Sequence, residues 1–233
     1  MSLASIGGLL LCVALAVGLE VLVVKAARAV MLSASPLSGD HTDSVVYHRS
    51  LFTPGESSLA GTWAGLIVAG LAFWAAWTFS ESWGYALAAV AWTAALSWDL
   101  WTWERVAASV KFVTWRRGWN QTSRRVSVSQ VTEVHVVEKS IAGPLSACYV
   151  ALTLDGGKAI KLPRTGTLGG LGAVENLANF VRLQVQQVAD VRQRIDNERR
   201  RAGKPPVDPA DRELRKKLTE LRRRHTVKAH LPH

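Results

Sequence analysis

Cysteine is scarce in this chain of 233 residues, where only Cys12 and Cys148 occur. There is no CxxC motif, and no cysteine or histidine pair has the spacing that zinc sites use. One cysteine lies in an apolar run and the other in a predicted strand, so they do not form a disulfide framework. The sequence therefore predicts neither a disulfide-stabilised fold nor a metal centre, and no cofactor is expected.

Catalytic patterns are lacking as well. The chain has no serine between elbow glycines with matching His and Asp, and no paired carboxylates in a recognisable loop. It also has no Walker phosphate loop. These absences favour a binding protein over an enzyme.

Long apolar runs are missing after Trp103, but three occur before it. They cover Ile6–Val24, Leu59–Phe79 and Trp83–Trp103, and each is long enough to cross a hydrocarbon core of about 30 Å. The first run lacks a basic leader region and a cleavage site, so it is predicted to be retained. The short polar turn at 80–82 predicts that the second and third helices form an antiparallel hairpin.

Small residues and tryptophans mark different parts of these runs. Close approach of the hairpin backbones is predicted at Gly61, Ala64, Gly65, Ala69, Gly70, Ala86, Ala88 and Ala89. One aromatic belt at headgroup depth is predicted from Trp74, Trp77, Trp83 and Tyr85. The other is predicted from Trp63, Trp98, Trp101 and Trp103. Trp92 lies in mid-span and is expected to pack between helices.

Basic side chains flank the spans on one side of the membrane only. Those between the first two runs are Lys25, Arg28 and Arg49, and those after the third are Arg105, Lys111, Arg116 and Arg117. Cytoplasmic loops carry such residues in excess. The N-terminus is therefore predicted outside and the C-terminal part in the cytoplasm.

Three carboxylates lie near the predicted cytoplasmic ends of the spans, at Glu20, Asp99 and Glu104. An acid inside a span is a candidate functional group. The favoured interpretation is an ion pair at the interface with Lys25, Arg28 or Arg105. A proton or ion pathway is the alternative.

The segment between the first two spans is rich in Ser, Gly and Pro, and residues 31–58 are predicted to form a flexible cytoplasmic loop. It holds side chains of metal-binding types at Asp40, His41, Asp43 and His48. Their spacing does not place any two on one helix face, so a metal site is not predicted.

From about Ser109 the apolar pattern changes to a period of two, which is typical of strands. A short irregular step at 129–130 separates two alternating runs, and 155–157 reads Asp-Gly-Gly, a hairpin turn. Short strands followed by one long helix predict an α+β fold, with a small curled antiparallel sheet capped by the helix.

The segment Arg124–Val136, which reads Arg-Arg-Val-Ser-Val-Ser-Gln-Val-Thr-Glu-Val-His-Val, resembles the strand–turn–strand segment of bacterial pleckstrin-homology-like domains. Residues 115–118 and 154–157 fall where that family places its first turn and a later hairpin. The resemblance covers about 109–184, and such domains often follow a pair of membrane helices. It implies a seven-stranded partial barrel closed by a helix and used for binding rather than catalysis. It implies no ligand residues.

A glycine-rich loop at 164–172 precedes the start of the long helix. Free backbone N–H groups at a helix N-terminus favour an anion. Candidate anion-binding residues are Arg164, Gly169, Gly170 and Gly172. The alternative is a flexible connection between strand and helix.

The long helix carries a heptad seam, with apolar residues and one Gln at steps of three and four. Its members are Val174, Leu177, Val181, Gln184, Val188, Val191 and Ile195. The first turns are predicted to cap the barrel. The later turns, from Val181 to Ile195, either extend beyond the barrel and pair as a coiled coil with another helix, from the same protein or a partner, or pack on the chain's own domain.

Most of the net charge of +10 lies at the end of the chain, where residues 199–233 hold 12 Lys or Arg against 4 Asp or Glu. A short amphipathic helix is predicted there, with an apolar stripe of Leu214, Leu218 and Leu221. The basic residues proposed to contact anionic lipid or a partner are Arg215, Lys216, Lys217, Arg222, Arg223 and Arg224. Binding of nucleic acid is not expected, because residues 199–233 contain no Phe, Trp or Tyr to stack on bases.

The predicted organisation is a first transmembrane helix at 1–30, the loop at 31–58, a transmembrane hairpin at 59–103, the cytoplasmic domain at 104–184 and a helical basic tail at 185–233. The leading hypothesis is a scaffold of the bacterial inner membrane that binds membrane lipids and a protein partner or a second copy of itself. One alternative is an accessory subunit of a larger transport or secretion complex. The other is a membrane-bound regulator whose tail touches nucleic acid.

Overall fold

The computed structural model describes residues 3–34, 37, 45–119, 121–142, 145–203, 214 and 216–220. The molecule is α+β, with antiparallel sheets and a long C-terminal helix, as the sequence predicts. The helices are α1 (Leu3–Ala34), α2 (Leu59–Phe79), α3 (Ser82–Trp101) and α4 (Thr167–Arg201). The strands are β1 (Val45–His48), β2 (Glu104–Ala108), β3 (Phe112–Arg117), β4 (Arg124–Ser127), β5 (Val131–Ala142), β6 (Leu145–Leu154), β7 (Ala159–Lys161) and β8 (Thr165–Gly166).

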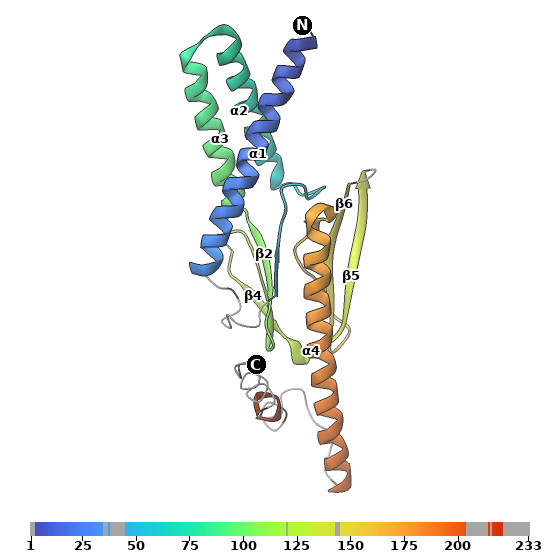
Figure 1. Ribbon diagram of the computed structural model, residues 1–233. Helices are drawn as coiled ribbons and strands as arrows, with labels where there is room; N and C mark the ends of the chain where they lie inside the picture. Colours follow the sequence, from blue (N-terminus) through green and yellow to red (C-terminus); the bar gives the residue numbers. More distant parts are fainter. Residues whose placement is uncertain are drawn as a thin grey trace, which may run out of the picture.

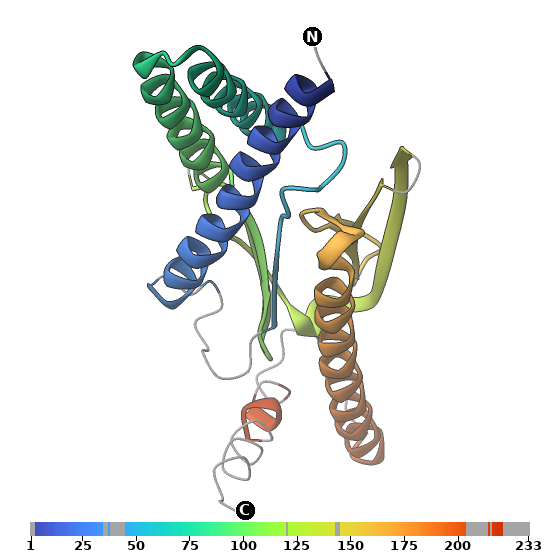
Figure 2. The same cartoon turned by 45° about the horizontal axis from the view of Figure 1, so that its top comes forward.

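Three helices form one end of the molecule, and the sheets with α4 form the other (Figure 1). Helices α2 and α3 form the predicted antiparallel hairpin, and α1 crosses it with the N-terminus at the same end as the hairpin turn (Figure 2). A Cβ on Gly65 would lie 2.8 Å from Ala95 Cβ, and one on Gly70 would lie 2.8 Å from Val13 Cα. The predicted close approach within the hairpin is therefore confirmed at Gly65, whereas Gly70 packs closely against α1 and not against α3.

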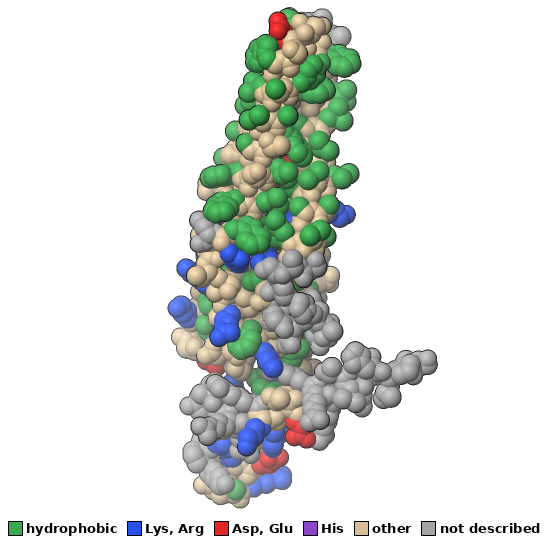
Figure 3. All heavy atoms as spheres, turned by 90° about the vertical axis from the view of Figure 1, so that its left-hand side faces the viewer, with side chains coloured by type: hydrophobic (Ala, Val, Ile, Leu, Met, Phe, Trp, Pro, Cys, Tyr) green, Lys and Arg blue, Asp and Glu red, His purple; other side chains and the backbone are tan. Residues whose placement is uncertain are grey.

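Two of the described helices are long and apolar enough to cross a membrane, namely α1 over Ser5–Met31 and α2. The expectation of three such helices is corrected on this criterion, because α3 includes Thr93, Ser97 and Asp99. Hydrophobic side chains cover the helical half of the molecule, and most of the visible Lys and Arg side chains lie beyond it (Figure 3). Trp92 of α3 donates a hydrogen bond to the Ala16 carbonyl of α1 at 3.2 Å, as expected of a residue between helices.

The first helix is longer than the predicted span and continues past Val24 to Ala34. The added turns contain Ala, Lys, Arg and Met, which favour the helical state, and no Pro or Gly interrupts them. At 1.5 Å per residue this helix is about 48 Å long, which exceeds the hydrocarbon core. Its last turns, with Lys25 and Arg28, therefore reach the level of the sheet (Figure 1).

The flexible loop predicted at 31–58 is corrected by strand β1. Val-Val-Tyr-His favours a strand, and it pairs antiparallel with β2, Tyr47 opposite Val106. Tyr47 is buried and its hydroxyl donates to the Pro163 carbonyl at 2.9 Å. The α2–α3 hairpin is thus inserted between two neighbouring strands of one sheet, so that sheet begins before the hairpin and not at residue 104. The candidates Asp40, His41 and Asp43 lie outside the described residues.

The strands form two sheets. The first has the order β1-β2-β3-β4, and the second has β5-β6-β7 with β8 paired to β6. The predicted irregular step is a single 3₁₀ turn at Val128–Gln130, which carries the chain from one sheet to the other. The predicted hairpin turn is also present, with positive φ at Gly156 and Gly157.

Helix α4 covers the core between the sheets. Its residues Val174, Leu177 and Val181 are fully buried in a cluster that includes Val106 of the first sheet and Val150 of the second. Beyond this core the helix continues without a break to Arg201. The boundary predicted at residue 184 therefore lies inside one helix.

Candidate functional site

A buried group of charges lies where the helices meet the first sheet. Asp99 near the end of α3 is fully buried and accepts from two arginines. Arg28 of α1 contacts its Oδ2 at 2.5 Å, and Arg49, directly after β1, contacts its Oδ1 at 2.7 Å. Pairing of Asp99 with Arg28 is among the pairings that the sequence predicts. Arg49 is a partner that sequence reasoning missed.

The two guanidinium groups also bond to neighbouring segments of the chain. Arg28 donates to the Arg49 carbonyl at 3.0 Å. Arg49 donates to Ser58 Oγ at 2.6 Å and to Thr102 Oγ1 at 3.1 Å. These bonds join α1, the end of β1, the start of α2 and the end of α3. Buried charges need such additional hydrogen bonds, because one carboxylate does not by itself offset the desolvation of two arginines.

Trp103 packs against this group and not at the membrane surface. The expectation that it belongs to an aromatic belt is corrected, because α3 ends at Trp101 and Trp103 is buried. The guanidinium carbons of Arg28 and Arg105 lie 5.4 and 5.3 Å from its ring centre, within cation–π range. Arg105 thus stacks on Trp103, whereas the sequence predicts it as a possible partner of an acid. The ring of His48 meets Trp103 edge-on at 6.1 Å.

The surroundings shift the pKa of ionisable groups beside this junction. Desolvation, together with the positive charge of Arg28, lowers the pKa of His48 to about 4. His48 is therefore neutral near pH 7. Burial is also the main cause that raises the pKa of Glu104 and lowers that of Arg105.

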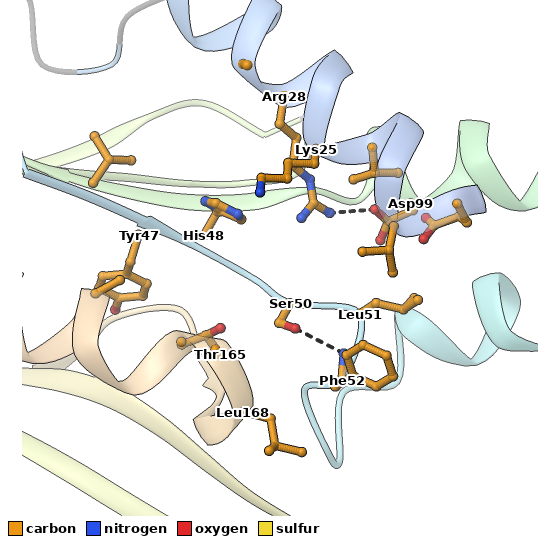
Figure 4. A pocket seen from close by; sticks show the side chains of 18 residues that line it. Lys25, Arg28, Tyr47, His48, Ser50, Leu51, Phe52, Asp99, Thr165 and Leu168 are labelled. Atoms are coloured by element: carbon orange, nitrogen blue, oxygen red, sulfur yellow. Dashed lines mark hydrogen bonds and ion pairs between the residues drawn. The ribbon is translucent and has the colours of Figure 1, made fainter. Parts of the chain in front are cut away.

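A cavity of about 430 Å³ opens beside the buried charges. Its walls are α1, strand β1 with the segment after it, and the start of α4 (Figure 4). Lys25 faces this space from α1, and Thr165 faces it from the segment before α4. Its wall is mostly apolar and includes Val24 and Leu51. The arrangement is typical of a binding site, where an apolar wall surrounds a few placed polar groups.

Three residues of the cavity wall have a buried polar atom without a hydrogen-bond partner in the described part of the chain. They are Glu20 (Oε1), Arg28 (Nε) and Thr165 (Oγ1), and Glu20 and Thr165 are each 1% exposed. Buried polar atoms are almost always paired. An unpartnered acceptor and an unpartnered hydroxyl in one cavity therefore indicate where a bound molecule would make hydrogen bonds.

Part of the predicted anion-binding loop lies at this cavity. Gly169 and Gly170 line it, whereas Arg164 and Gly172 are exposed and do not. Leu168 and Gly169 have non-helical backbone angles, with φ of +78° at Gly169, so the regular helix begins at Gly170. The first regular residue of a long helix therefore lies in the wall of the cavity.

The heptad seam divides between two apolar clusters. Val174, Leu177 and Val181 belong to the domain core, and Gln184 is half-buried between the clusters. The outer members Val188, Val191 and Ile195 contact two residues of the C-terminal segment, Leu214 and Leu218. The later turns thus extend beyond the domain core and meet helical residues of the same chain, which is the first of the two alternatives.

Two of the basic residues proposed to contact lipid or a partner lie in the described part of the chain. Lys217 contacts Glu198 of α4 at 2.7 Å, and Lys216 is exposed. The other candidates, Arg215, Arg222, Arg223 and Arg224, lie outside the described residues, so their proposed contact with lipid stays a prediction.

Within the residues that the structure covers, no three His, Cys, Asp or Glu side chains are grouped to hold a metal ion. Cys12 and Cys148 are both free thiols, and burial raises the pKa of Cys148 to about 11. The chain matches no protein-family model, and no curated protein is similar to it. The functional interpretation therefore rests on the junction and its cavity.

Proposed function

We propose that the chain is a non-catalytic binding or scaffold protein anchored in the bacterial inner membrane. In this proposal α1 and α2 cross the membrane with the N-terminus outside, and α3, which is less apolar, crosses as the returning half of the α2–α3 hairpin. The two sheets and α4 form a cytoplasmic domain of the pleckstrin-homology-like type, which binds a protein partner or a second copy of the chain. Anionic lipid is contacted by this domain and by the basic tail.

The observation that supports the proposal is the insertion of the α2–α3 hairpin between β1 and β2. A domain on a flexible tether moves independently of its anchor, but here α3 leads into β2 within a few residues. The segment 49–58 between β1 and α2 is held at Arg49, which bonds to Asp99 of α3. The buried contacts of Asp99 with Arg28 and Arg49 fasten α1 to the same place. An interaction made by the domain would therefore be transmitted to the membrane helices.

The exposed face of α4 is the surface on which we test for a bound protein partner. Leu183 is 57% exposed there, whereas Leu177 on the opposite face is fully buried in the core. A photoreactive amino acid at position 183 of the full chain, activated in intact cells, is expected to give a discrete protein adduct. The same group at position 177 is the matched control and is expected to give none.

The size and composition of the adduct distinguish the alternatives. An adduct of two copies of the chain, or of the chain with one partner, supports the scaffold. Recovery with a large transport or secretion complex supports the accessory subunit. Absence of any protein adduct at 183 and at other exposed domain positions contradicts the proposal.

A further inference from the structure

We propose that the cavity between α1, β1 and the start of α4 binds the headgroup of one membrane phospholipid. The phosphate lies at Thr165, Lys25 and the N-terminus of α4. A hydrogen-bond donor of the headgroup lies at Glu20. The headgroup of this lipid carries both a phosphate and a hydrogen-bond donor, as the headgroups of phosphatidylglycerol and phosphatidylethanolamine do. This inference rests on the proposed membrane attachment.

The phosphate end is defined by three independent features of the cavity wall. Thr165 has a buried hydroxyl without a partner in the described chain, and a hydroxyl readily donates to a phosphate oxygen. Lys25 lines the same space and forms no ion pair with any described carboxylate. The regular part of α4 begins at Gly170, so its first N–H groups and its positive dipole end lie beside this hydroxyl.

Gly170 brings the hydroxyl and the helix end together. A Cβ at this position would lie 2.7 Å from Thr165 Oγ1, which is too close for a side chain. Only glycine therefore lets the Thr165 hydroxyl lie over the first turn of α4. A hydroxyl, the backbone N–H groups of a helix start and an ammonium group are the groups from which phosphate sites are typically built, and all three belong to residues of this cavity wall.

The cavity wall also offers an acceptor for a hydrogen-bond donor of the headgroup. Glu20 is buried on α1, and its Oε1 has no partner among the described residues. A carboxylate accepts hydrogen bonds and repels a second anion, so it does not serve the phosphate itself. The hydroxyls of a glycerol headgroup or the ammonium of an ethanolamine headgroup would satisfy it.

The rim of the cavity explains why the ligand is a lipid and not a free phosphate compound. Large apolar side chains of the cavity wall are exposed at Val21, Phe52 and Leu168. Phe52 lies edge-on to Trp63, 5.9 Å between ring centres, at the predicted belt of headgroup depth. Acyl chains leaving the cavity would cover this rim and then follow the exposed leucines of α1. A water-soluble phosphate compound would leave it uncovered.

The test uses the full chain in mild detergent, stripped of lipid and supplied with one probe at a time. The probes are palmitoyl-oleoyl phosphatidylglycerol, the corresponding phosphatidylethanolamine, the corresponding diacylglycerol, and glycerol 3-phosphate. Native mass spectrometry counts the bound molecules. We expect one phosphatidylglycerol or phosphatidylethanolamine to be retained, and diacylglycerol to be retained at least about five-fold less, because it lacks the phosphate.

Two substitutions and their controls locate the site. Lys25→Gln and Thr165→Val are each expected to weaken phospholipid retention about five-fold, the loss that one charged contact or hydrogen bond produces. The controls Lys161→Gln on β7 and Thr132→Val on β5 change the same residue types outside the cavity and are expected to retain the lipid. Thr165→Val is also expected to melt no lower than the wild type without lipid, because it removes an unpaired hydroxyl.

Equal retention of phospholipid by the cavity variants and the controls would overturn the inference, and so would equal retention of diacylglycerol. Displacement of the lipid by glycerol 3-phosphate at similar concentration would show a free phosphate ligand and would overturn the lipid assignment. If one of these results is obtained while position 183 still crosslinks to a protein, the cavity inference fails and the scaffold proposal stands.

Discussion

Asp99 is the residue on which the junction between helices and sheet depends most. It is the carboxylate that Arg28 and Arg49 share, and all three side chains are buried. Asp99→Asn leaves two buried guanidinium groups without a counter-charge, and removing one partner of a buried pair typically costs about 3–5 kcal/mol. We expect a correspondingly lower unfolding free energy in detergent, measured by thermal or chemical unfolding. Asp190→Asn on the exposed face of α4 is the matched control, and equal stability of the two variants would contradict this role.

His48 makes the stability of the junction depend on pH. Desolvation and the charge of Arg28 lower its pKa to about 4 in the folded chain, whereas an unfolded histidine titrates near 6.5. Between these values the unfolded state binds the extra proton, so stability falls as the pH drops through this window. Solvent at the exposed part of the ring screens some of this effect.

The comparison that isolates this effect is between the wild type and His48→Gln. Chemical unfolding at about pH 7 and about pH 5 is expected to show a larger loss of stability for the wild type. An identical loss in both proteins would mean that His48 titrates normally in the folded state.

Sequence reasoning reached part of this group of residues. The acid Asp99 inside an apolar run and a basic residue after the first run are visible in the sequence, and their pairing was predicted. Arg49 was missed because it lies in a segment rich in Ser, Gly and Pro, where nothing local indicates burial. Thr165 was missed for a similar reason, since an isolated threonine before a glycine-rich loop is ordinary and only the fold buries its hydroxyl.

Among the elements, the α2–α3 hairpin depends on its glycines. A Cβ at Gly65 would lie 2.8 Å from Ala95 Cβ, whereas Gly18 of α1 has open space around it. Gly65→Leu is therefore expected to separate the two helices and lower the melting temperature in detergent, by overpacking of about 1–3 kcal/mol or more. Gly18→Leu is the control on an open face. Equal melting of the two variants would show that the hairpin is not closely packed at Gly65.

The outer half of α4 depends on the C-terminal segment for its cover. Ile195 is fully buried against the cluster that contains Leu214 and Leu218. Ile195→Asp puts a charge into this contact and is expected to release the segment, so hydrogen exchange at 216–220 should become faster while exchange in the sheets is unchanged. Gln187→Asp on the exposed face of α4 is the control. Unchanged exchange at 216–220 in Ile195→Asp would contradict the contact.

Long patterns in the sequence predicted elements better than short ones. The α4 seam, the irregular step before β5 and the turn at 155–157 follow from local periodicity and turn chemistry. β1 and β2 were missed, because each is only a few residues long and is held by pairing with the other across the inserted hairpin. Such pairing between segments about 60 residues apart is set by tertiary contacts and not by local propensity.

At the scale of the whole molecule, the helices and the sheets are connected at several points. The hairpin joins β1 to β2, the end of α1 is fastened through Arg28, and Tyr47 of β1 bonds to the Pro163 carbonyl just before β8. These links would let the helices and the domain respond together when either of them is bound. That property suits the proposed scaffold, in which the domain binds a partner and the helices anchor it.

The central claim is that the α2–α3 hairpin crosses the membrane and returns, so that β1 and β2 lie on the same side. Single cysteines test it in a chain whose Cys12 and Cys148 are replaced by serine. Ser57→Cys before α2 and Lys158→Cys in the sheet region are both expected to resist a membrane-impermeant maleimide in intact cells and to react after permeabilisation. Glu81→Cys at the hairpin turn is expected to react in intact cells. The claim would be contradicted if Glu81→Cys reacted only after permeabilisation, as the other two do. It would also be contradicted if only one of Ser57→Cys and Lys158→Cys reacted in intact cells.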